Sequence, residues 1–301
     1  MNTHVYHTAV LVEEVLEYLA PRPGGVYVDV TFGGGGHTRA ILEKEPECSV
    51  IAFDWDTVAL ETNGAPLQEE FGDRLTLVWG NFAHIVRLLD KQGVESVDGI
   101  LADFGTSQHQ IGKRAGFSFV QDTPLDMRMS PAHQKTTAAD LVNNASAQTL
   151  AQLFVDLGQE KFARKIAHAI VAEREQKPFK TTRQLAGLIE RLVPGGGKRD
   201  KIHPATRVFQ ALRIAVNKEL ENINSFLRGA LQVLHAEGRL VCISFHSLED
   251  RMVKQFMREQ AQQGTVELLS KGAVMAADAE LAVNPSSRSA RLRAIKIVRN
   301  D

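Results

Sequence analysis

The chain has 301 residues, and its 35 Lys and Arg against 36 Asp and Glu give a formal net charge of −1. Hydrophobic residues make up 44% and charged residues 24%, which is the balance of an ordinary globular protein. This charge argues against a globally basic nucleic-acid coat protein and against a long acidic tail, but it leaves room for a local basic patch.

The N-terminus and the cysteines indicate the compartment. The first residues contain no basic stretch and carry Glu13 and Glu14 early, unlike a signal peptide. No apolar run approaches the roughly 18 residues that a membrane span needs. Cys48 and Cys242 lie in apolar, strand-like runs and are too few for a disulfide framework or a four-cysteine zinc site. We therefore expect a cytoplasmic protein.

The first hundred residues alternate strand-like and helix-like segments. Apolar, β-branched runs predict strands at Val26–Thr31, Ser49–Phe53, Leu75–Trp79 and Val97–Ala102. Helix-like stretches lie between these runs, and one of them covers His37–Glu45. This alternation is typical of βαβ units, so we expect a doubly wound parallel sheet of the Rossmann-like α/β class.

The alternation stops between Gln108 and Ala205, where the patterns are helical only. It resumes with a long amphipathic helix at Arg207–His235, a strand at Arg239–Phe245, a helix from Ser247 and a last strand at Leu292–Val298. The simplest organisation is an α/β domain built from residues 1–107 and 206–301, with an all-helical domain inserted at 108–205. The apolar positions of the long helix fit either a core or a homodimer contact, so the chain is expected to be a monomer or a homodimer.

A glycine turn follows the first strand. Gly33–Gly36 lie between that strand and a helix, where glycine lets the backbone turn tightly and approach a ligand closely. The start of the following helix offers unpaired N–H groups to an anionic group. A glycine-rich connection without a ligand is the alternative.

Two acids refine the expected ligand. Asp54 closes the second strand at about the spacing at which an acid bonds the ribose hydroxyls of a nucleoside cofactor, although it also fits an N-cap. Asp29 precedes the glycines and suits a cofactor with a cationic amino-acid end, such as S-adenosylmethionine. A hydride-transfer enzyme stays possible on this segment alone. Asp103 ends the fourth strand, beside the crevice where such sheets bind ligands, or else caps the following turn.

At this point the chain resembles the bacterial small-subunit ribosomal RNA (cytosine-N4) methyltransferase family, whose motifs occur here in the family's order over nearly the whole length. The matching segments are HTAVL (from His7), DVTFGGGGHT (from Asp29), GFSF (from Gly116), PLDMRM (from Pro124), EKFARKIA (from Glu160), HPATRVFQALRIAVNKEL (from His203), ISFHSLEDRMVK (from Ile243) and NPSSRSARLR (from Asn284). One segment departs from the family. It usually reads DLGVSSPQLD after the fourth strand, whereas this chain reads DFGTSQHQIG from Asp103, which puts activity or cofactor affinity in question.

The resemblance implies a class I methyltransferase sheet that uses S-adenosylmethionine. The cofactor contacts that it implies are Gly35, Gly36, His37, Asp54, Phe82, Asp103 and Gln110. A core position for Phe82 and a helix-start cap for His37 are the alternatives. The expected reaction is methyl transfer to the exocyclic N4 of a cytidine in 16S ribosomal RNA of the decoding centre.

Asp103 is the expected catalytic residue, because a carboxylate that accepts a hydrogen bond from N4 would localise the lone pair of that nitrogen. His246 and Glu249 follow a late strand and are expected in the base pocket. Alternatively, they belong to the start of the next helix, where Ser247 and Asp250 fit a capping box. No His, Cys and acid spacing indicates a metal site.

Charge is distributed unevenly. Residues Lys161–Lys218 carry 14 Lys and Arg against 4 Asp and Glu, so this stretch is basic within a neutral chain. We expect it to face RNA, through Lys198, Arg199, His203, Arg207 and Arg213, although a solvated helical face is the common meaning of such a run. A methyltransferase of a small molecule or protein, and a non-catalytic cofactor-binding RNA-assembly factor, are the competing functions.

Overall fold

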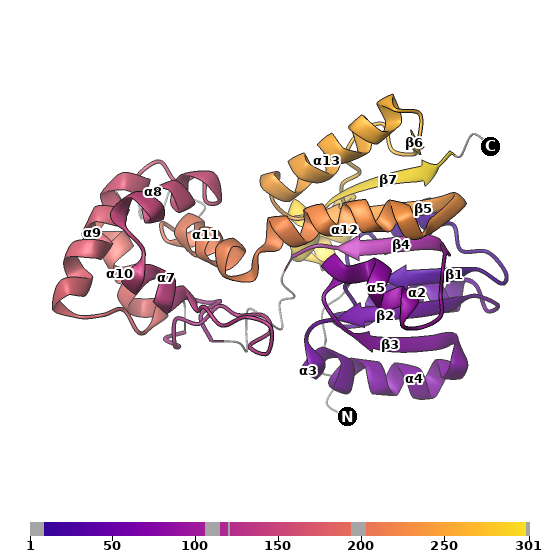
Figure 1. Cartoon of the computed structure of the whole chain (residues 1–301), viewed down its shortest axis with the longest axis horizontal. Coiled ribbons are helices and arrows are strands. Elements are labelled where there is room, and N and C mark those ends of the chain that lie inside the picture. Colours follow the sequence, from indigo (N-terminus) through magenta and orange to yellow (C-terminus); the bar gives the residue numbers. More distant parts are fainter. Residues whose placement is uncertain (1–8, 106–114, 120, 194–202, 299–301) are drawn as a thin grey trace. The chain divides into compact units, whose positions relative to one another are not determined.

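The structure is a computed structural model and describes residues 9–105, 115–119, 121–193 and 203–298. The chain divides into two compact units (Figure 1). One contains Met1–Ser107 and Leu220–Asp301 and is called the sheet unit below. The other contains Gln108–Glu219 and is called the helical unit.

The sheet unit is built on seven strands in the order β3-β2-β1-β4-β5-β7-β6. The strands are β1 (Val26–Asp29), β2 (Ser49–Asp54), β3 (Leu75–Trp79), β4 (Val97–Asp103), β5 (Leu234–Ser244), β6 (Val266–Leu268) and β7 (Arg291–Ile297). β1 to β5 pair in parallel, whereas β7 is antiparallel to both β5 and β6. The strand order reverses between β1 and β4, and the crevice at the carboxyl ends of such strands is where open α/β sheets bind ligands.

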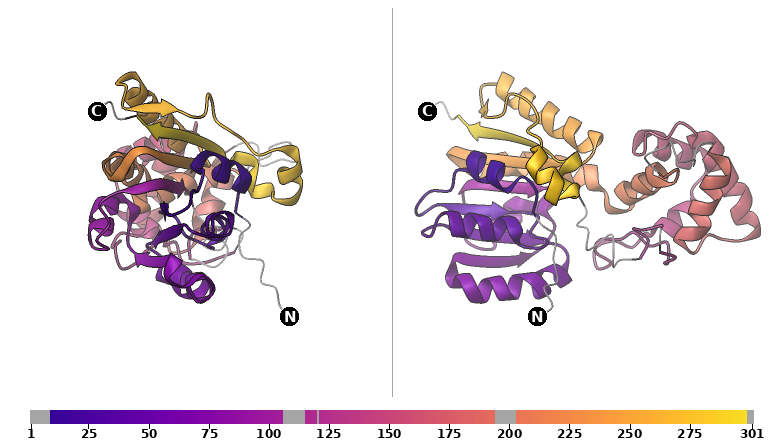
Figure 2. Two further views of the ribbon diagram at one scale, coloured as in Figure 1. Left: turned by 90° about the vertical axis from the view of Figure 1, so that its right-hand side faces the viewer. Right: turned by 180° about the vertical axis from the view of Figure 1, so that it is seen from behind.

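Helices cover both faces of the sheet, as the predicted doubly wound class requires. The helices of this unit are α1 (Val12–Leu19), α2 (Gly36–Lys44), α3 (Thr57–Ala59), α4 (Ala65–Phe71), α5 (Ile85–Asp90), α12 (Glu219–Val233), α13 (Ser247–Gln262) and α14 (Asp278–Val283). Successive strand residues point to opposite faces, so Val28 joins one core with Phe226, while Tyr27 joins the other with Ile41. Figure 1 shows α5 and α12 in front of the sheet, and Figure 2 shows the indigo α1 on the opposite face.

The helical unit has a core of its own. Its helices are α7 (Ala138–Asn144), α8 (Ala147–Asp156), α9 (Ala163–Gln176), α10 (Thr182–Leu192) and α11 (Thr206–Asn217). Leu150, Phe154, Ile166 and Leu212 are fully buried in it. Side chains cap several helix starts, as Thr137 and Asp140 do in the capping box of α7. This separate hydrophobic core accounts for the compactness of the helical unit.

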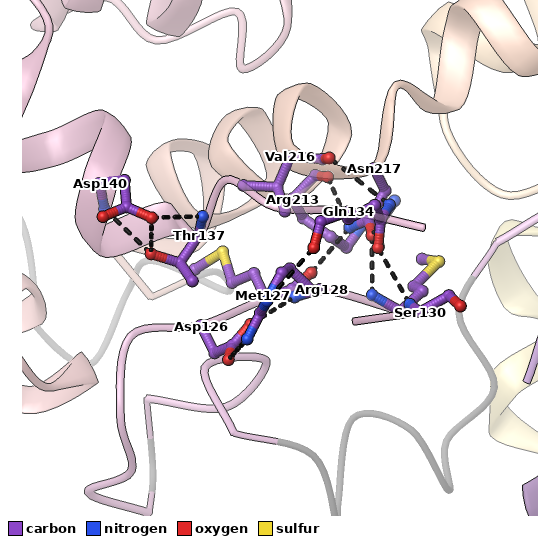
Figure 3. A network of polar contacts seen from close by, with 11 residues as sticks. Asp126, Met127, Arg128, Ser130, Gln134, Thr137, Asp140, Arg213, Val216 and Asn217 are labelled. Carbon is purple, nitrogen blue, oxygen red and sulfur yellow. Dashed lines mark hydrogen bonds and ion pairs between the residues drawn. The ribbon is translucent and has the colours of Figure 1, made fainter. Parts of the chain in front are cut away.

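A buried amide ties α11 to an extended segment of the helical unit (Figure 3). The Nδ2 group of Asn217 donates to the carbonyl oxygen of Met127 at 2.8 Å, and its Oδ1 accepts from the backbone N–H of Met129 at 2.8 Å. Gln134 also donates to that Oδ1, at 2.7 Å. Two of the segments that carry the resemblance, PLDMRM and HPATRVFQALRIAVNKEL, are therefore joined here by hydrogen bonds.

The long helix expected at Arg207–His235 is wrong, because two helices replace it. The chain breaks at Lys218, whose φ of 51° is left-handed, between α11 and α12. Leu212 of α11 is buried in the helical core, while Phe226 of α12 is buried in the sheet unit, so the two halves serve different cores. The helical unit accordingly extends to Glu219, beyond the boundary expected at 205.

Cys48 and Cys242 are both free and buried. Burial raises the pKa of the Cys48 thiol to about 11 and raises the pKa of Cys242 as well, so both thiols stay protonated at neutral pH. None of the helices in the described ranges is long and apolar enough to cross a membrane.

Candidate active site

The glycine turn after β1 adopts conformations that favour glycine. Gly33 has a φ of 50° and Gly35 a φ of 74°, both in the left-handed region. A Cβ atom at Gly35 would lie 2.9 Å from the Phe32 ring, and one at Gly36 would lie 2.9 Å from the Cβ of Ala9. The protein's own packing therefore requires glycine at 35 and 36. No side chain caps the start of α2, which leaves its first N–H groups for a ligand or water.

Asp29, at the end of β1, is held by two threonines. Its Oδ1 accepts from the backbone N–H of Thr31 at 3.1 Å, and its Oδ2 accepts from the hydroxyl of Thr38 at 2.7 Å. The side chain is buried, and burial raises the pKa of this carboxyl. A buried acid in this position favours a neighbouring cation.

His37 links the N-terminal segment to the crevice. Its Nε2 lies 2.8 Å from the carbonyl oxygen of Val10 and donates to it, while its Nδ1 lies 3.8 Å from Oδ2 of Asp103. Gly35 is the N-cap of α2 and the ring of His37 makes no capping bond, so the helix-cap alternative is wrong. The buried imidazole instead faces the acid at the end of β4.

Asp103 is the least satisfied acid of the crevice. Its backbone N–H donates to the Thr31 hydroxyl at 2.7 Å, yet its buried Oδ1 has no hydrogen-bond partner within the described ranges. Burial raises the pKa of Asp103 to about 7, the charges of Asp29 and Glu249 raise it further, and His37 opposes them. An orphaned buried oxygen costs about 1–3 kcal/mol, so a ligand N–H donor fits this position.

The end of β5 presents a second unsatisfied atom. His246 is the N-cap of α13, and it forms a capping box with Glu249. Glu249 is buried, and its Oε2 accepts from the backbone N–H of Phe245 at 2.8 Å. The His246 Nε2 lies 3.1 Å from Oε1 of Glu249 without forming a hydrogen bond to it, and this buried atom has no hydrogen-bond partner among the described residues.

The capping box expected from Ser247 and Asp250 is therefore wrong by one residue. Asp250 instead lies 2.7 Å from the guanidinium of Arg293 and 3.3 Å from that of Arg291. These arginines lower the pKa of the Asp250 carboxyl, against the effect of its partial burial. They belong to the NPSSRSARLR motif, so part of that motif holds the start of α13.

Asp54 joins the glycine turn to the end of β2. Its Oδ2 accepts from the backbone N–H of Gly33 and its Oδ1 from that of Asp56, both at 2.8 Å. Asp56, not Asp54, caps α3, so the N-cap alternative is wrong. Burial raises the pKa of Asp54 to about 6. Each oxygen retains a second lone pair, and the contact with a ribose stays a prediction.

Phe82 lies in an aromatic cluster. Its ring centroid is 5.9 Å from that of Phe104 and 5.6 Å from that of Phe226, and the side chain is half-buried against the core. This packing supports the core alternative. Only the exposed part of the Phe82 side chain is available for the expected contact with adenine.

The residues expected to face RNA differ from one another. Arg207 is exposed, whereas Arg213 lies 2.9 Å from Glu219 through two hydrogen bonds. His203 stacks on Phe119, and its Nε2 lies 2.7 Å from Glu190. The structure thus uses Arg213 and His203 in local contacts, and Arg207 is better suited to RNA. The predictions for Gln110, Lys198 and Arg199 lie outside the described residues.

The crevice also contains residues that were not among the expected site residues, although they lie in the matched segment DVTFGGGGHT. Thr31 and Thr38 orient Asp103 and Asp29, and nothing in their spacing in the sequence indicates this. Asp29 was recognised from its pattern, an acid that ends an apolar strand before a glycine turn. Its burial, and its influence on the pKa of Asp103, appear only in three dimensions.

The strand order, the antiparallel β7 and a glycine turn at the point where the order reverses define a class I S-adenosylmethionine-dependent methyltransferase. Within that class the chain belongs to the MraW methylase family, whose model matches residues 4–298.

Two curated relatives carry the name ribosomal RNA small subunit methyltransferase H. The protein from Syntrophotalea carbinolica is 48% identical, with 96% of this chain and 97% of the relative covered. The protein from Bradyrhizobium diazoefficiens is 47% identical, with 96% and 90% covered. A solved rRNA methylase from Streptococcus thermophilus matches with 11% identity and a TM-score of 0.43 over 96% and 94% of the two chains, a likeness too distant to bear on function.

The residues of the crevice fit S-adenosylmethionine. This cofactor carries a sulfonium and an amino group, and such cations would stabilise the ionised forms of Asp29 and Asp103, which burial disfavours. The glycine turn offers backbone N–H groups beside them, at an uncapped helix start that suits a carboxylate.

Proposed function

We propose that this methyltransferase transfers a methyl group to the exocyclic N4 of a cytidine in small-subunit ribosomal RNA. The observation that carries the proposal is the buried Oδ1 of Asp103 at the crevice end of β4, which accepts from no donor among the residues that the structure describes. The N4 amino group of cytosine is a donor of the required kind. The names of the relatives support ribosomal RNA as the substrate, and the family motifs support cytidine N4.

The bound cofactor supplies an activated methyl group on a sulfonium, so the protein contributes mainly position and electrostatics. The N4 nitrogen is a poor nucleophile because its lone pair is delocalised into the ring. The Asp103 carboxylate accepts a hydrogen bond from an N4 hydrogen, localises that lone pair and disperses the positive charge that develops on nitrogen. Because burial raises the pKa of Asp103 to about 7, the acid can also take up the proton released after transfer.

Several residues of the sheet unit would hold the cofactor. The backbone at Gly35 and Gly36 borders the methionine end, and Asp54 accepts from the ribose hydroxyls. His37 has one ring nitrogen bonded to Val10 and the other facing Asp103, so it acts by keeping that acid in place.

RNA binding is assigned to exposed cations of the helical unit. Those whose side chains form no ion pair within the described ranges are Lys135, Lys161, Arg164, Lys165, Lys177, Lys180, Arg183, Arg207 and Lys218. Phosphate contacts come mainly from such side chains, and their release of counterions makes binding steeply salt-dependent. A cytoplasmic location is part of the proposal, supported by two free cysteines.

Incubation of the enzyme with labelled S-adenosylmethionine and with small ribosomal subunits, free RNA or protein fractions tests the proposal. The RNA is then digested to nucleosides and analysed. We expect label in RNA, as N4-methylcytidine. Label in protein, or on another base, would overturn the proposal, and a comparison of the subunit with free RNA identifies the better substrate.

A further inference from the structure

The ends of β4 and β5 bring two unsatisfied polar atoms to one side of the crevice. The strands pair in parallel with Asp103 opposite Ile243, and the Phe104 N–H donates to the Ile243 carbonyl oxygen at 2.9 Å. A Cβ atom at Gly105 would lie 3.1 Å from the Phe245 ring, so the two chain segments stay close beyond the strand ends. Asp103 Oδ1 and His246 Nε2 are the buried side-chain atoms without a hydrogen-bond partner in the described part of the chain.

The surroundings of His246 determine which kind of group it offers. Its Nδ1 accepts from the backbone N–H of Glu249 at 3.4 Å as the cap of α13, so in the neutral ring the proton is on Nε2. Glu249 holds this geometry from the other side, because its Oε2 accepts from the backbone N–H groups of Phe245 and His246. His246 therefore presents a donor just beyond the end of β5, and Asp103 presents an acceptor at the end of the neighbouring strand β4.

This pair matches one nucleobase edge. Cytosine has a donor at N4 beside an acceptor at N3, whereas uracil has an acceptor at O4 beside a donor at N3. We propose that Asp103 and His246 together read the Watson–Crick edge of the target cytosine, with Asp103 accepting from N4 and His246 Nε2–H donating to N3. Glu249 is the positioning residue that fixes the ring of His246. This inference rests on the proposed function and adds the source of base specificity. Enzymes that act on flipped bases read them through such contacts.

Two substitutions separate the base contact from the cap. His246→Asn retains a good N-cap and removes the donor at the Nε2 position, whereas His246→Gln retains a donor near that position and weakens the cap. We expect His246→Asn to lower kcat/KM for RNA by roughly tenfold, the value of about one hydrogen bond, with little change in thermal stability. His246→Gln should keep most of kcat/KM and unfold at a lower temperature.

The decisive experiment pairs these variants with a changed base. The wild type and His246→Asn are assayed on RNA with the methylated cytidine intact or replaced by 3-deazacytidine, which has a C–H group in place of N3. The base change should lower kcat/KM of the wild type by a factor roughly ten times larger than the factor by which it lowers kcat/KM of His246→Asn. Because both enzymes act on the same altered base, comparing the two factors in a double cycle cancels the changed reactivity of N4. Equal losses in both enzymes, or a larger loss in the variant, would overturn the inference.

Failure of the proposed function gives a different result. In that case the wild type makes no N4-methylcytidine on intact RNA. Ser247→Ala is the matched control, since Ser247 is the exposed neighbour of His246, and it should change neither kcat/KM nor the response to 3-deazacytidine.

Discussion

The sheet unit and the helical unit use charge in opposite ways. In the sheet unit the charges that matter are few, acidic and buried, and Asp29, Asp54 and Asp103 all have raised pKa values because burial disfavours their ionised forms. In the helical unit the charges are numerous, basic and largely exposed, as the side chains of Arg164, Lys177 and Arg207 are. Buried acids, whose ionisation burial disfavours, suit chemistry on a bound ligand, whereas exposed basic side chains suit the binding of a polyanion such as RNA.

The net charge of −1 therefore averages two unlike regions. The near-zero net charge is therefore no argument against RNA as a partner. The comparison also separates residues within the basic region, because Arg213 and His203 are engaged with acids of the same unit and Arg207 is not.

Asp103→Asn should have the largest effect. Asparagine keeps the size of the side chain but cannot disperse the charge that develops on N4, so we expect turnover at saturating S-adenosylmethionine and RNA to fall by about 10²–10⁴. Thermal unfolding should show no loss of stability, since Oδ1 of this largely buried acid has no hydrogen-bond partner in the described part of the chain. Turnover near that of the wild type would remove Asp103 from the chemistry.

The pH dependence of stability tests the burial of the same acid. Its folded pKa of about 7 lies above the ordinary value of 3.8, so the folded state binds the proton more tightly. The resulting stabilisation is complete below about pH 4, and it is lost as the pH rises towards 7. Between pH 4.5 and 7.5 the ligand-free wild type should therefore lose at least about 1 kcal/mol more unfolding free energy than Asp103→Asn. Parallel stability curves would contradict this assignment.

Arg207→Gln and Arg213→Gln form a matched pair within the helical unit. Arg213 pairs with Glu219, so its replacement should lower the free energy of unfolding by on the order of 2 kcal/mol. Arg207 is exposed, so its replacement should leave stability unchanged and reduce the slope of log affinity for RNA against log salt by about one. Chemical denaturation and RNA titrations at several salt concentrations measure both. A loss of stability in Arg207→Gln together with a smaller salt slope in Arg213→Gln would contradict the different roles assigned to the two arginines.

Substitutions of two glycines should change stability in opposite directions. Gly35→Ala places a Cβ 2.9 Å from the Phe32 ring at a φ of 74°, and it should destabilise the protein by about 1–3 kcal/mol. Gly187→Ala lies inside α10 with its nearest neighbour 3.9 Å away, and it should stabilise by up to about 1 kcal/mol. Thermal melts of the two variants provide the comparison, and a stabilised Gly35→Ala would show that the turn is not constrained as described.

The sequence predicts the parallel strands well and the helices less well. β1 to β4 lie within two residues of their expected positions, because strands buried on both faces are continuous apolar runs. α1, α7, α14 and the three-residue β6 were not predicted. The break at Lys218 could not be predicted either, since Arg207–His235 has one amphipathic pattern and only the two separate cores reveal two helices.

In the crevice, sequence reasoning identified positions better than partners. Gly35, Asp103 and His246 lie at the turn and strand ends where ligands bind in such sheets. The bond from His37 to Val10, the core packing of Phe82 and the pairing of Asp250 with Arg293 depend on residues brought together by the fold. The capping box at His246 was missed because histidine is an uncommon N-cap.

The most direct test of the account is the single-turnover rate of N4-methylcytidine formation in small-subunit RNA, followed by nucleoside mass spectrometry from pH 6 to pH 8. The account predicts N4-methylcytidine as the product and a rate that rises with pH as the Asp103 carboxylate forms. A different methylated nucleoside, or a rate that does not change with pH while Asp103→Asn stays active, would contradict it.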